Sequence, residues 1–153
     1  MLKIITFPDP GLVNRTKQIS SVDVNVKKLI VQMRETLKSA NGIGLAANQV
    51  GQSIQLEIIE NNRTESEIIP FTVIINPKIL SASRDITIES EGCLSLPEIS
   101  VRVPRSNLIK ISALDEYGNM RIIKARGLFS RVIQHEIDHL NGILITDYGE
   151  SEK

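Results

Sequence analysis

The stretch QHEIDHL, residues 134–140, contains both histidines of the 153-residue chain. His135 and His139 are four residues apart, so on a helix they stand about 40° apart around the axis and roughly 6 Å apart along it. Two imidazoles in that arrangement can reach one metal ion. Glu136 is rotated about 100° from His135, close enough to act on a water molecule beside such an ion. The H-E-x-x-H pattern therefore predicts a metal-binding helix with a proton carrier beside its ligands.

The residues around this stretch predict a helix from about Gly127 to Asn141. Its apolar positions recur at helical spacing, and Gly142 stands where a C-terminal cap is expected. The alternative to a metal site is that both histidines are ordinary surface residues of an amphipathic helix. The apolar stripe consists of Leu128, Val132, Ile133, Ile137 and Leu140.

The rest of the chain predicts one further helix and several strands, with no internal repeat. The helix is expected between Asp23, as its N-cap, and Ala40, with Gly42 as a stop signal. The strands are short runs rich in Ile and Val, and DEYGN, residues 115–119, joins the last two as a hairpin. Their expected ranges are 55–60, 71–76, 86–89, 100–103, 108–114 and 120–125. We therefore predict an α+β fold: a single compact domain of residues 1–153 with short, mainly antiparallel strands around a central metal-binding helix.

Charge and hydropathy exclude several classes of partner. Lys and Arg together number 18, as do Asp and Glu, and no block of like charge indicates a nucleic-acid or membrane surface. No apolar run approaches the length of a membrane span, and the first residues, MLKIITFPDPG, hold too short an apolar run for a signal peptide. We therefore expect a cytoplasmic monomer that binds neither nucleic acid nor membrane.

A catalytic metal site of this kind uses three protein ligands and leaves one position for water, so a third ligand is needed. The downstream candidates, as in the H-E-x-x-H metalloproteases, are Asp147, Glu150 and Glu152 near the end of the chain. The upstream candidate is Cys93, which as the only cysteine cannot form an internal disulfide. A lone cysteine is ordinarily an inert small residue of the core. The residues by themselves leave these readings open.

A third unusual stretch, NGIGLAANQVG, covers residues 41–51. It lacks the third glycine of a dinucleotide fingerprint and the Lys-Ser/Thr of a phosphate loop. Its glycines and alanines allow close approach of either a substrate or a neighbouring element of the fold. Gln49 is an uncharged amide among apolar neighbours, so it needs a hydrogen-bond partner, and its NH₂ group can donate to a developing oxyanion.

Together, GIGLAANQ (42–49), EGCLS (91–95) and QHEIDH (134–139) resemble, in order and spacing, the three signature motifs of the peptide deformylases. The resemblance extends from Phe7 to Leu144. It implies an enzyme that removes the formyl group from the N-terminal formyl-methionine of nascent polypeptides, at the ribosome, and releases formate. Two alternatives stay open: an H-E-x-x-H metalloprotease with a downstream acidic ligand, and a metal-binding relative without activity.

The resemblance implies a metal site with a defined ligand set. Cys93, His135 and His139 would hold one divalent ion, Fe²⁺ in vivo, with Zn²⁺, Ni²⁺ or Co²⁺ able to replace it. Imidazole and thiolate ligands suit zinc at least as well as iron, so the ligand types do not choose the metal. Glu136 would take a proton from the attacking water and return it to the leaving amine.

The resemblance also implies how the substrate is held. The oxyanion would accept hydrogen bonds from the Gln49 side-chain amide and the Leu94 backbone N–H. Backbone groups of three residues would bind the peptide in strand fashion, and three residues of the second helix would line a pocket for the methionine side chain. These positions are Ile43, Gly44 and Gly92 for the backbone, and Leu128, Arg131 and Val132 for the pocket.

Arg131 is the least expected residue of that pocket, because the same stretch of helix is mostly apolar in the relatives. In one interpretation its methylene stem lies on the pocket wall and its guanidinium lies in water. In the other, the guanidinium reaches across the pocket mouth to the peptide backbone or to an acidic residue after the methionine.

Overall fold

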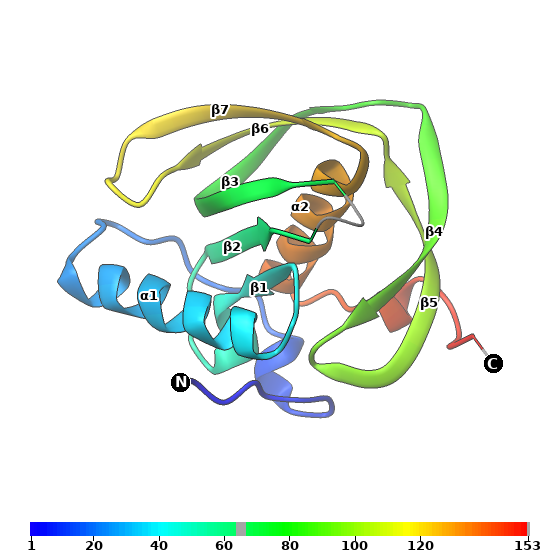
Figure 1. Ribbon diagram of the computed structural model, residues 1–153, viewed down its shortest axis with the longest axis horizontal. Coiled ribbons are helices and arrows are strands. Elements are labelled where there is room, and N and C mark those ends of the chain that lie inside the picture. The colour runs from blue at the N-terminus through cyan, green and yellow to red at the C-terminus, as the bar shows by residue number, and fades with distance from the viewer. Residues whose placement is uncertain (64–66, 153) are drawn as a thin grey trace.

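Two helices, α1 (Val24–Ser39) and α2 (Gly127–Leu140), cover opposite faces of one antiparallel sheet (Figure 1). The computed structural model describes residues 1–63 and 67–152. The sheet has the order β1-β2-β3-β6-β7, and its strands are β1 (Gly44–Ala46), β2 (Leu56–Asn61), β3 (Ile69–Ala82), β6 (Leu108–Leu114) and β7 (Met120–Arg126). Strands β4 (Ile86–Cys93) and β5 (Leu96–Ser106) form a separate two-stranded hairpin. The predicted α+β fold with antiparallel strands around α2 is confirmed.

Strand β2 is buried along its whole length because helices cover both of its faces. Leu56 and Ile58 belong to the hydrophobic cluster that includes Met33 of α1. Ile59 points to the other face and belongs to the cluster that includes Ile133 of α2. Side chains of a strand alternate between the two faces, so a strand covered on both sides is apolar at nearly every position.

Both helices begin and end where the sequence predicted, with Asp23 and Ala40 as the caps of α1 and with α2 running from Gly127 to its C-cap Asn141. Asp23 caps α1, since its Oδ1 accepts the Val26 N–H at 2.9 Å. Helix α2 begins at Gly127, and its C-terminal end is closed by Gly142, which has φ 75° and donates to the His139 carbonyl. No helix in the described part of the chain is long and apolar enough to cross a membrane.

The stop signal of α1 was assigned to the wrong residue. Asn41, not Gly42, takes the left-handed conformation, with φ 56°. The Asn41 N–H donates to the Lys38 carbonyl, and the Gly42 N–H donates to the Leu37 carbonyl. This is the Schellman motif, in which one residue in the left-handed conformation ends an ordinary α-helix. Gly42 is needed for packing instead, because a Cβ there would lie 2.9 Å from the Cδ1 atoms of both Leu37 and Leu94.

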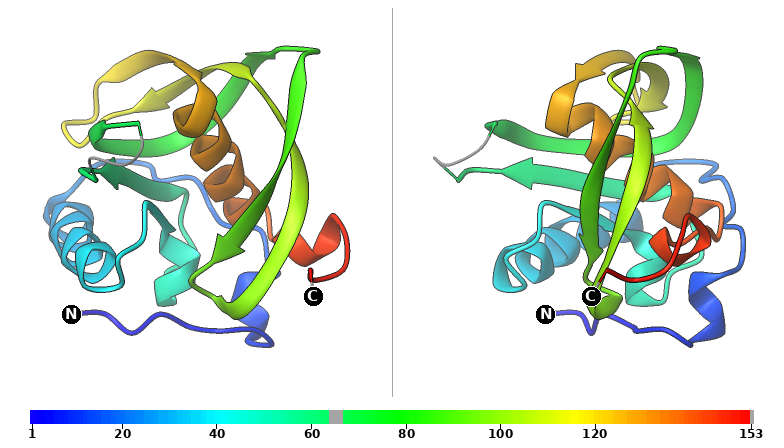
Figure 2. Two further views of the ribbon diagram at one scale, coloured as in Figure 1. Left: turned by 45° about the vertical axis from the view of Figure 1, so that its right-hand side comes forward. Right: turned by 90° about the vertical axis from the view of Figure 1, so that its right-hand side faces the viewer.

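Strands β3, β4 and β5 are several residues longer than the sequence predicted, and β1 was not predicted. Strand β3 continues to Ala82 although Asn76 has φ 50° and Pro77 has no N–H, because a register shift against β6 between Ile75 and Lys78 absorbs both residues. Strands β4 and β5 pair over most of their length, so their hairpin reaches past α2 (Figure 2). Cys93 ends β4 at the turn of this hairpin.

Glu57 is a buried acid on the α2 face of β2. It pairs with Ala46 and Ile74 in the neighbouring strands, and its side chain is fully buried. Neither carboxyl oxygen of Glu57 has a hydrogen-bond partner in the described residues. Burial, and then the neighbouring carboxyl of Glu136, raises the pKa of Glu57 well above its ordinary value of 4.5. The folded protein therefore favours the protonated form of Glu57.

Glu57→Ile is expected to stabilise the protein by about 1–3 kcal/mol at pH 7, because it removes an uncompensated polar group from the core. When folding raises the pKa of a group, the group contributes its full stabilisation of the folded state at pH values below its pKa in the unfolded chain. That contribution is lost as the pH rises through its pKa in the folded protein. The advantage of the variant over the parent should therefore grow as pH rises above 4.5. Urea unfolding of both proteins across this pH range measures it.

The control is Glu35→Gln on the exposed face of α1, which should change the free energy of unfolding by less than about 0.5 kcal/mol. Coincident stability curves for the parent and Glu57→Ile would show that the Glu57 carboxyl does not oppose folding, and a constant offset would show that its pKa is not raised by folding.

Candidate metal centre

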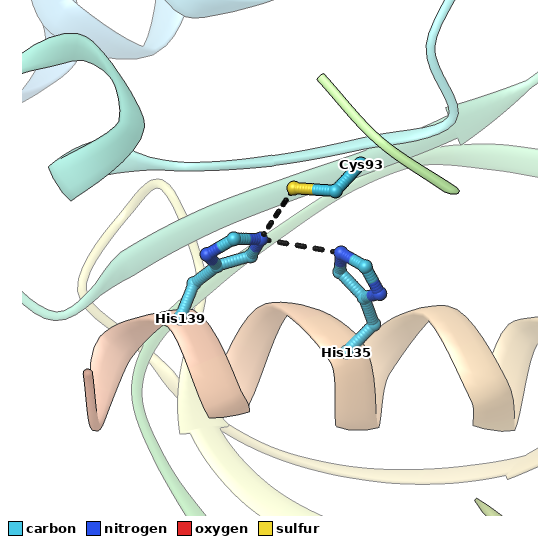
Figure 3. A group of neighbouring side chains, drawn as sticks. All are labelled: Cys93, His135 and His139. Carbon is cyan, nitrogen blue, oxygen red and sulfur yellow. Dashed lines mark hydrogen bonds between the residues drawn. The ribbon is translucent and has the colours of Figure 1, made fainter. Parts of the chain in front are cut away.

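The side chains of Cys93, His135 and His139 converge between the end of β4 and α2 (Figure 3). Cys93 Sγ lies 3.3 Å from His139 Nε2, and that nitrogen lies 3.2 Å from His135 Nε2. The three ligand atoms all lie within 4.8 Å of one another. Two imidazole nitrogens and a sulfur form a donor set typical of zinc and related divalent ions. The group therefore has the atoms and the spacing to hold one divalent cation.

Cys93, rather than a downstream acid, lies at the two imidazoles. Asp147 Oδ2 instead accepts the Leu144 N–H at 2.9 Å, at the start of the short 3-10 helix η3 (Ile145–Asp147). Glu152 Oε1 accepts a hydrogen bond from the Ser100 hydroxyl at 3.0 Å. Both carboxylates are thus engaged elsewhere, which argues against the ligand set of the metalloprotease alternative.

Glu91 fixes the orientation of His135. Its Oε1 lies 2.8 Å from His135 Nδ1, and the Arg105 guanidinium donates to both of its oxygens at 2.9 Å. Burial by itself would raise the pKa of Glu91, but the hydrogen bonds from His135 and Arg105 outweigh burial and lower the pKa to about 2. Because an ionised carboxylate only accepts, His135 Nδ1 carries the proton and Nε2 keeps its lone pair for a metal.

Glu136 lies beside the ligands and is 3% exposed. Its Oε2 is 4.0 Å from His135 Nε2, and its Oε1 has no hydrogen-bond partner in the described part of the chain. Burial raises the pKa of Glu136 to about 7, although His135 opposes the shift. A carboxyl group with a pKa near neutrality can both accept and release a proton.

Gln49 is held in one orientation by hydrogen bonds at both ends of its amide. It lies on the 3-10 helix η2 (Ala47–Val50), and its Oε1 accepts the Ala46 N–H at 2.9 Å. Its Nε2 donates to Ser95 Oγ at 3.1 Å and lies 3.8 Å from Cys93 Sγ. The donor end of the amide is therefore aimed at the Cys93 side of the metal centre.

A cleft of about 410 Å³ opens over this group. Gln49, Cys93, Leu94, His135 and Glu136 line it, whereas His139 is buried beneath it. The six positions expected to bind substrate line the same cleft: Ile43, Gly44, Gly92, Leu128, Arg131 and Val132.

Both interpretations of the Arg131 head group are wrong. Arg131 is 6% exposed, so its guanidinium does not lie in water. It does not reach across the cleft either, because Nη1 donates to Glu91 at 2.6 Å and Nη2 donates to the Thr87 carbonyl at 2.9 Å. The sequence pattern placed Arg131 on the correct face of α2 but gave no sign of acceptors that lie about 40 residues away along the chain.

Sequence reasoning assigned no role to three residues that support the ligands. Glu91 had a local signal, because it directly precedes Gly92 and Cys93 in the EGCLS motif. Arg105 had none, since its contact with Glu91 forms only when β4 and β5 pair. Asn48 Nδ2 donates to the His139 carbonyl at 2.5 Å, which ties the end of α2 to η2.

An α+β fold whose central H-E-x-x-H helix meets an upstream cysteine, with a buried glutamate at the same cleft, defines a metal-dependent hydrolase. The chain belongs to the polypeptide deformylase family, whose sequence model matches residues 1–153. The peptide deformylase of Dictyoglomus turgidum is 41% identical over 152 residues, covering 99% of this chain and 95% of the relative.

Solved structures agree with this assignment. The crystal structure of the Thermotoga maritima peptide deformylase aligns with a TM-score of 0.90 at 38% identity, covering 100% of this chain and 99% of that one. The Met-Ala-Ser-bound peptide deformylase of Acinetobacter baumannii aligns with a TM-score of 0.90 at 30% identity, covering 96% and 97%. The family resemblance of the three motifs is thus confirmed over the whole chain.

Gly44→Ala is expected to destabilise the protein by about 1–3 kcal/mol, because an added methyl overpacks the junction of β1 and α2. Its Cβ would lie 2.7 Å from Glu136 Oε2 and 2.8 Å from Val132 Cγ1, so these side chains must move. Gly92→Ala is the matched control, since the nearest atom to its Cβ, the Ile99 carbonyl oxygen, is 3.9 Å away. Denaturant unfolding compares them, and equal stability of the two variants would contradict the packing argument.

Cys93→Ala should purify with far less than one metal ion per chain, because a three-ligand site loses most of its affinity with one ligand. Cys93→Asp should retain metal, because a carboxylate also binds divalent ions. Elemental analysis of both purified variants measures metal content, and full occupancy in Cys93→Ala would refute the assignment of Cys93 as a ligand.

Proposed function

We propose that this protein is a peptide deformylase that hydrolyses the formyl amide of N-formyl-methionyl polypeptides to formate and a free N-terminus. The observation that carries this proposal is the meeting of Cys93, His135 and His139 with Glu136 and Gln49 at one cleft. Membership of the polypeptide deformylase family supports the same activity. The bound Met-Ala-Ser in the Acinetobacter baumannii relative is what such a reaction would leave after the formyl group is removed.

Cys93, His135 and His139 would hold one divalent ion, and we propose Fe²⁺ in vivo, with Zn²⁺, Ni²⁺ or Co²⁺ able to substitute. When bound, the ion would supply Lewis-acid chemistry by making a water molecule more acidic and polarising a carbonyl group. The His135 tautomer set by Glu91 fits this role, because Nδ1 donates to the carboxylate and leaves Nε2 for the ion.

Glu136 moves the proton in the proposed reaction. Its carboxylate accepts a proton from the attacking water as oxygen adds to the formyl carbon. It then gives that proton to the amine nitrogen of methionine as the carbon–nitrogen bond breaks. Burial, which raises the pKa of Glu136 to about 7, makes both transfers accessible at neutral pH.

Gln49 and Leu94 would stabilise the oxyanion that forms on the formyl oxygen. The Gln49 amide is already oriented by the Ala46 N–H and Ser95, so its donor needs no reorganisation during the reaction. Leu94 follows Cys93 at the turn of the β4–β5 hairpin, which places its backbone N–H beside the same ligand. Losing one such donor typically slows a reaction by about 10²–10³-fold.

The substrate peptide would bind as an added strand along β1. Strand β1 is the edge of the five-stranded sheet, and its residue Gly44 lines the cleft, as does Gly92 on the opposite wall. An extended peptide can pair with such an edge through backbone hydrogen bonds. Leu128 and Val132 would form an apolar part of the cleft wall against which the methionine side chain packs.

We also propose that the protein acts as a monomer on nascent chains, at the ribosome and in the cytoplasm. Family membership supports formyl-methionyl peptides as substrates. The balance of 18 basic and 18 acidic residues supports contact with the emerging peptide rather than direct binding to nucleic acid.

Glu136→Ala should keep its metal but lose about 10²–10⁴-fold in kcat, because the group that accepts and returns the proton is gone. Formate release from a formyl-Met peptide gives kcat, and elemental analysis of anaerobically purified protein gives the metal and its identity. Turnover within about tenfold of the parent would remove Glu136 from the proposed role.

The same assay separates the two alternatives. A metal-loaded parent that releases no formate would be a binding relative without activity. A parent that cleaves internal peptide bonds, and whose Cys93→Ala variant keeps its metal, would be a metalloprotease.

A further inference from the structure

The alignment of the metal ligands depends on how the β4–β5 hairpin docks against α2. Cys93 lies on the hairpin, while His135 and His139 lie on α2. Within the described residues, the hairpin shares no hydrogen-bonded ladder with the five-stranded sheet. Side-chain contacts must therefore hold the cysteine against the two imidazoles, since no continuous sheet does so.

One anchor of the hairpin lies toward the C-terminal end of α2. Arg105 of β5 donates to Asp138 Oδ2 at 2.6 Å and to both oxygens of Glu91 on β4. The Tyr148 hydroxyl donates to the same Asp138 oxygen at 2.6 Å. Through Glu91, this anchor also reaches His135 Nδ1.

Arg131 forms a second anchor, toward the N-terminal end of α2. Its Nη1 donates to Glu91 Oε2 at 2.6 Å and to the Val103 carbonyl at 2.9 Å. Its Nη2 donates to the Thr87 carbonyl at 2.9 Å and to the Thr87 hydroxyl at 3.1 Å. Its Nε lies 3.4 Å from Glu89 Oε2. Every nitrogen of the guanidinium thus faces an acceptor on the hairpin, and both hairpin strands are held.

The two anchors lie on either side of a metal ligand. Positions 131, 135 and 138 are four and then three residues apart, so they form one face of α2. A chain of ion pairs with alternating charge crosses between this face and the hairpin. It runs from Asp138 through Arg105, Glu91 and Arg131 to Glu89. Ser106, at the end of β5, also hydrogen-bonds to Ser130 and Gln134 of α2, so the hairpin is joined to the helix there as well. Arg131 is the arginine that joins the helix directly to Thr87 and Val103 of the hairpin.

We propose that Arg131 is a positioning residue of the metal centre, which clamps the hairpin to α2 and holds Glu91 against His135. This inference deepens the proposed function, because it names a determinant of the same site. Arg131 then acts through Glu91 and the hairpin, not through contact with the substrate. Arg131 lines the cleft, but the donors of its guanidinium are committed to the protein.

Arg131→Leu and Arg131→Lys test this proposal in protein loaded with Co²⁺. Leucine removes every donor, whereas lysine keeps the charge near Glu91 but cannot reach Thr87 and Val103 in the same planar geometry. The release of Co²⁺ to excess chelator should be accelerated about tenfold or more in Arg131→Leu, as is typical when support of a ligand is lost. Arg131→Lys should fall between this variant and the parent.

Two further measurements distinguish positioning from general loss of stability. The thiolate-to-cobalt absorption band should weaken or shift in Arg131→Leu at temperatures where circular dichroism shows a folded protein. For formate release, kcat should fall while KM for a formyl-Met peptide stays within about threefold, because the substrate contacts are intact. Arg131→Lys, which keeps a buried ion pair available, provides the same readouts if Arg131→Leu does not fold.

The matched control is Arg102→Leu, an exposed arginine of the same hairpin that donates to the Ile88 carbonyl at 3.1 Å. It should match the parent in Co²⁺ release, absorption spectrum and kcat. Unchanged Co²⁺ release and spectrum in Arg131→Leu would overturn the proposal, and so would a raised KM with unchanged kcat and metal retention. Co²⁺ release needs no turnover, so its result stands even if the parent releases no formate.

Discussion

The carboxylate of Glu91 is the point at which α2 and the β4–β5 hairpin are joined. It accepts hydrogen bonds from Arg105 and Arg131, which are buried, and from the Nδ1 of His135, which lines the cleft. Burying a charge is costly unless its partners and hydrogen bonds are complete, so this carboxylate favours one arrangement of helix and hairpin over others. That arrangement determines where the Cys93 sulfur meets the imidazoles, and therefore whether a cation can be held.

Three buried glutamates have different pKa values because their surroundings differ. Hydrogen bonds from His135 and Arg105 lower the pKa of Glu91 to about 2 against the effect of burial, whereas burial raises the pKa of Glu136 to about 7. Burial raises the pKa of Glu57, which has no hydrogen-bond partner in the described residues, well above its ordinary value. Environment thus separates the pKa values of chemically identical side chains, and it suits the Glu91 carboxylate to structural support and the Glu136 carboxyl to the proposed proton transfer.

Local patterns predicted most of the site because its chemistry is concentrated in three short motifs. The spacing of His135 and His139 on one helix face follows from helix geometry alone. Gly44 was expected to keep an approach clear for substrate, and the structure adds that Glu136 and Val132 leave no room for a side chain. Glu91 lay within a recognised motif and still received no role, since nothing local shows that its oxygens face His135 and two arginines.

The sequence by itself determined the two helices, the antiparallel α+β class and the family, because helical periodicity, strand composition and motif spacing are properties of neighbouring residues. The residues alone left the third ligand open until the family resemblance indicated Cys93, and the structure places its sulfur at the histidines. Only the tertiary structure decided that the Arg131 guanidinium binds Thr87, Val103 and Glu91. A guanidinium donates hydrogen bonds to any acceptors that the fold brings within about 3 Å, whatever their separation along the chain. Which acceptors lie that close depends on how the helix and the hairpin pack in the folded protein, and a local sequence pattern carries no information about it.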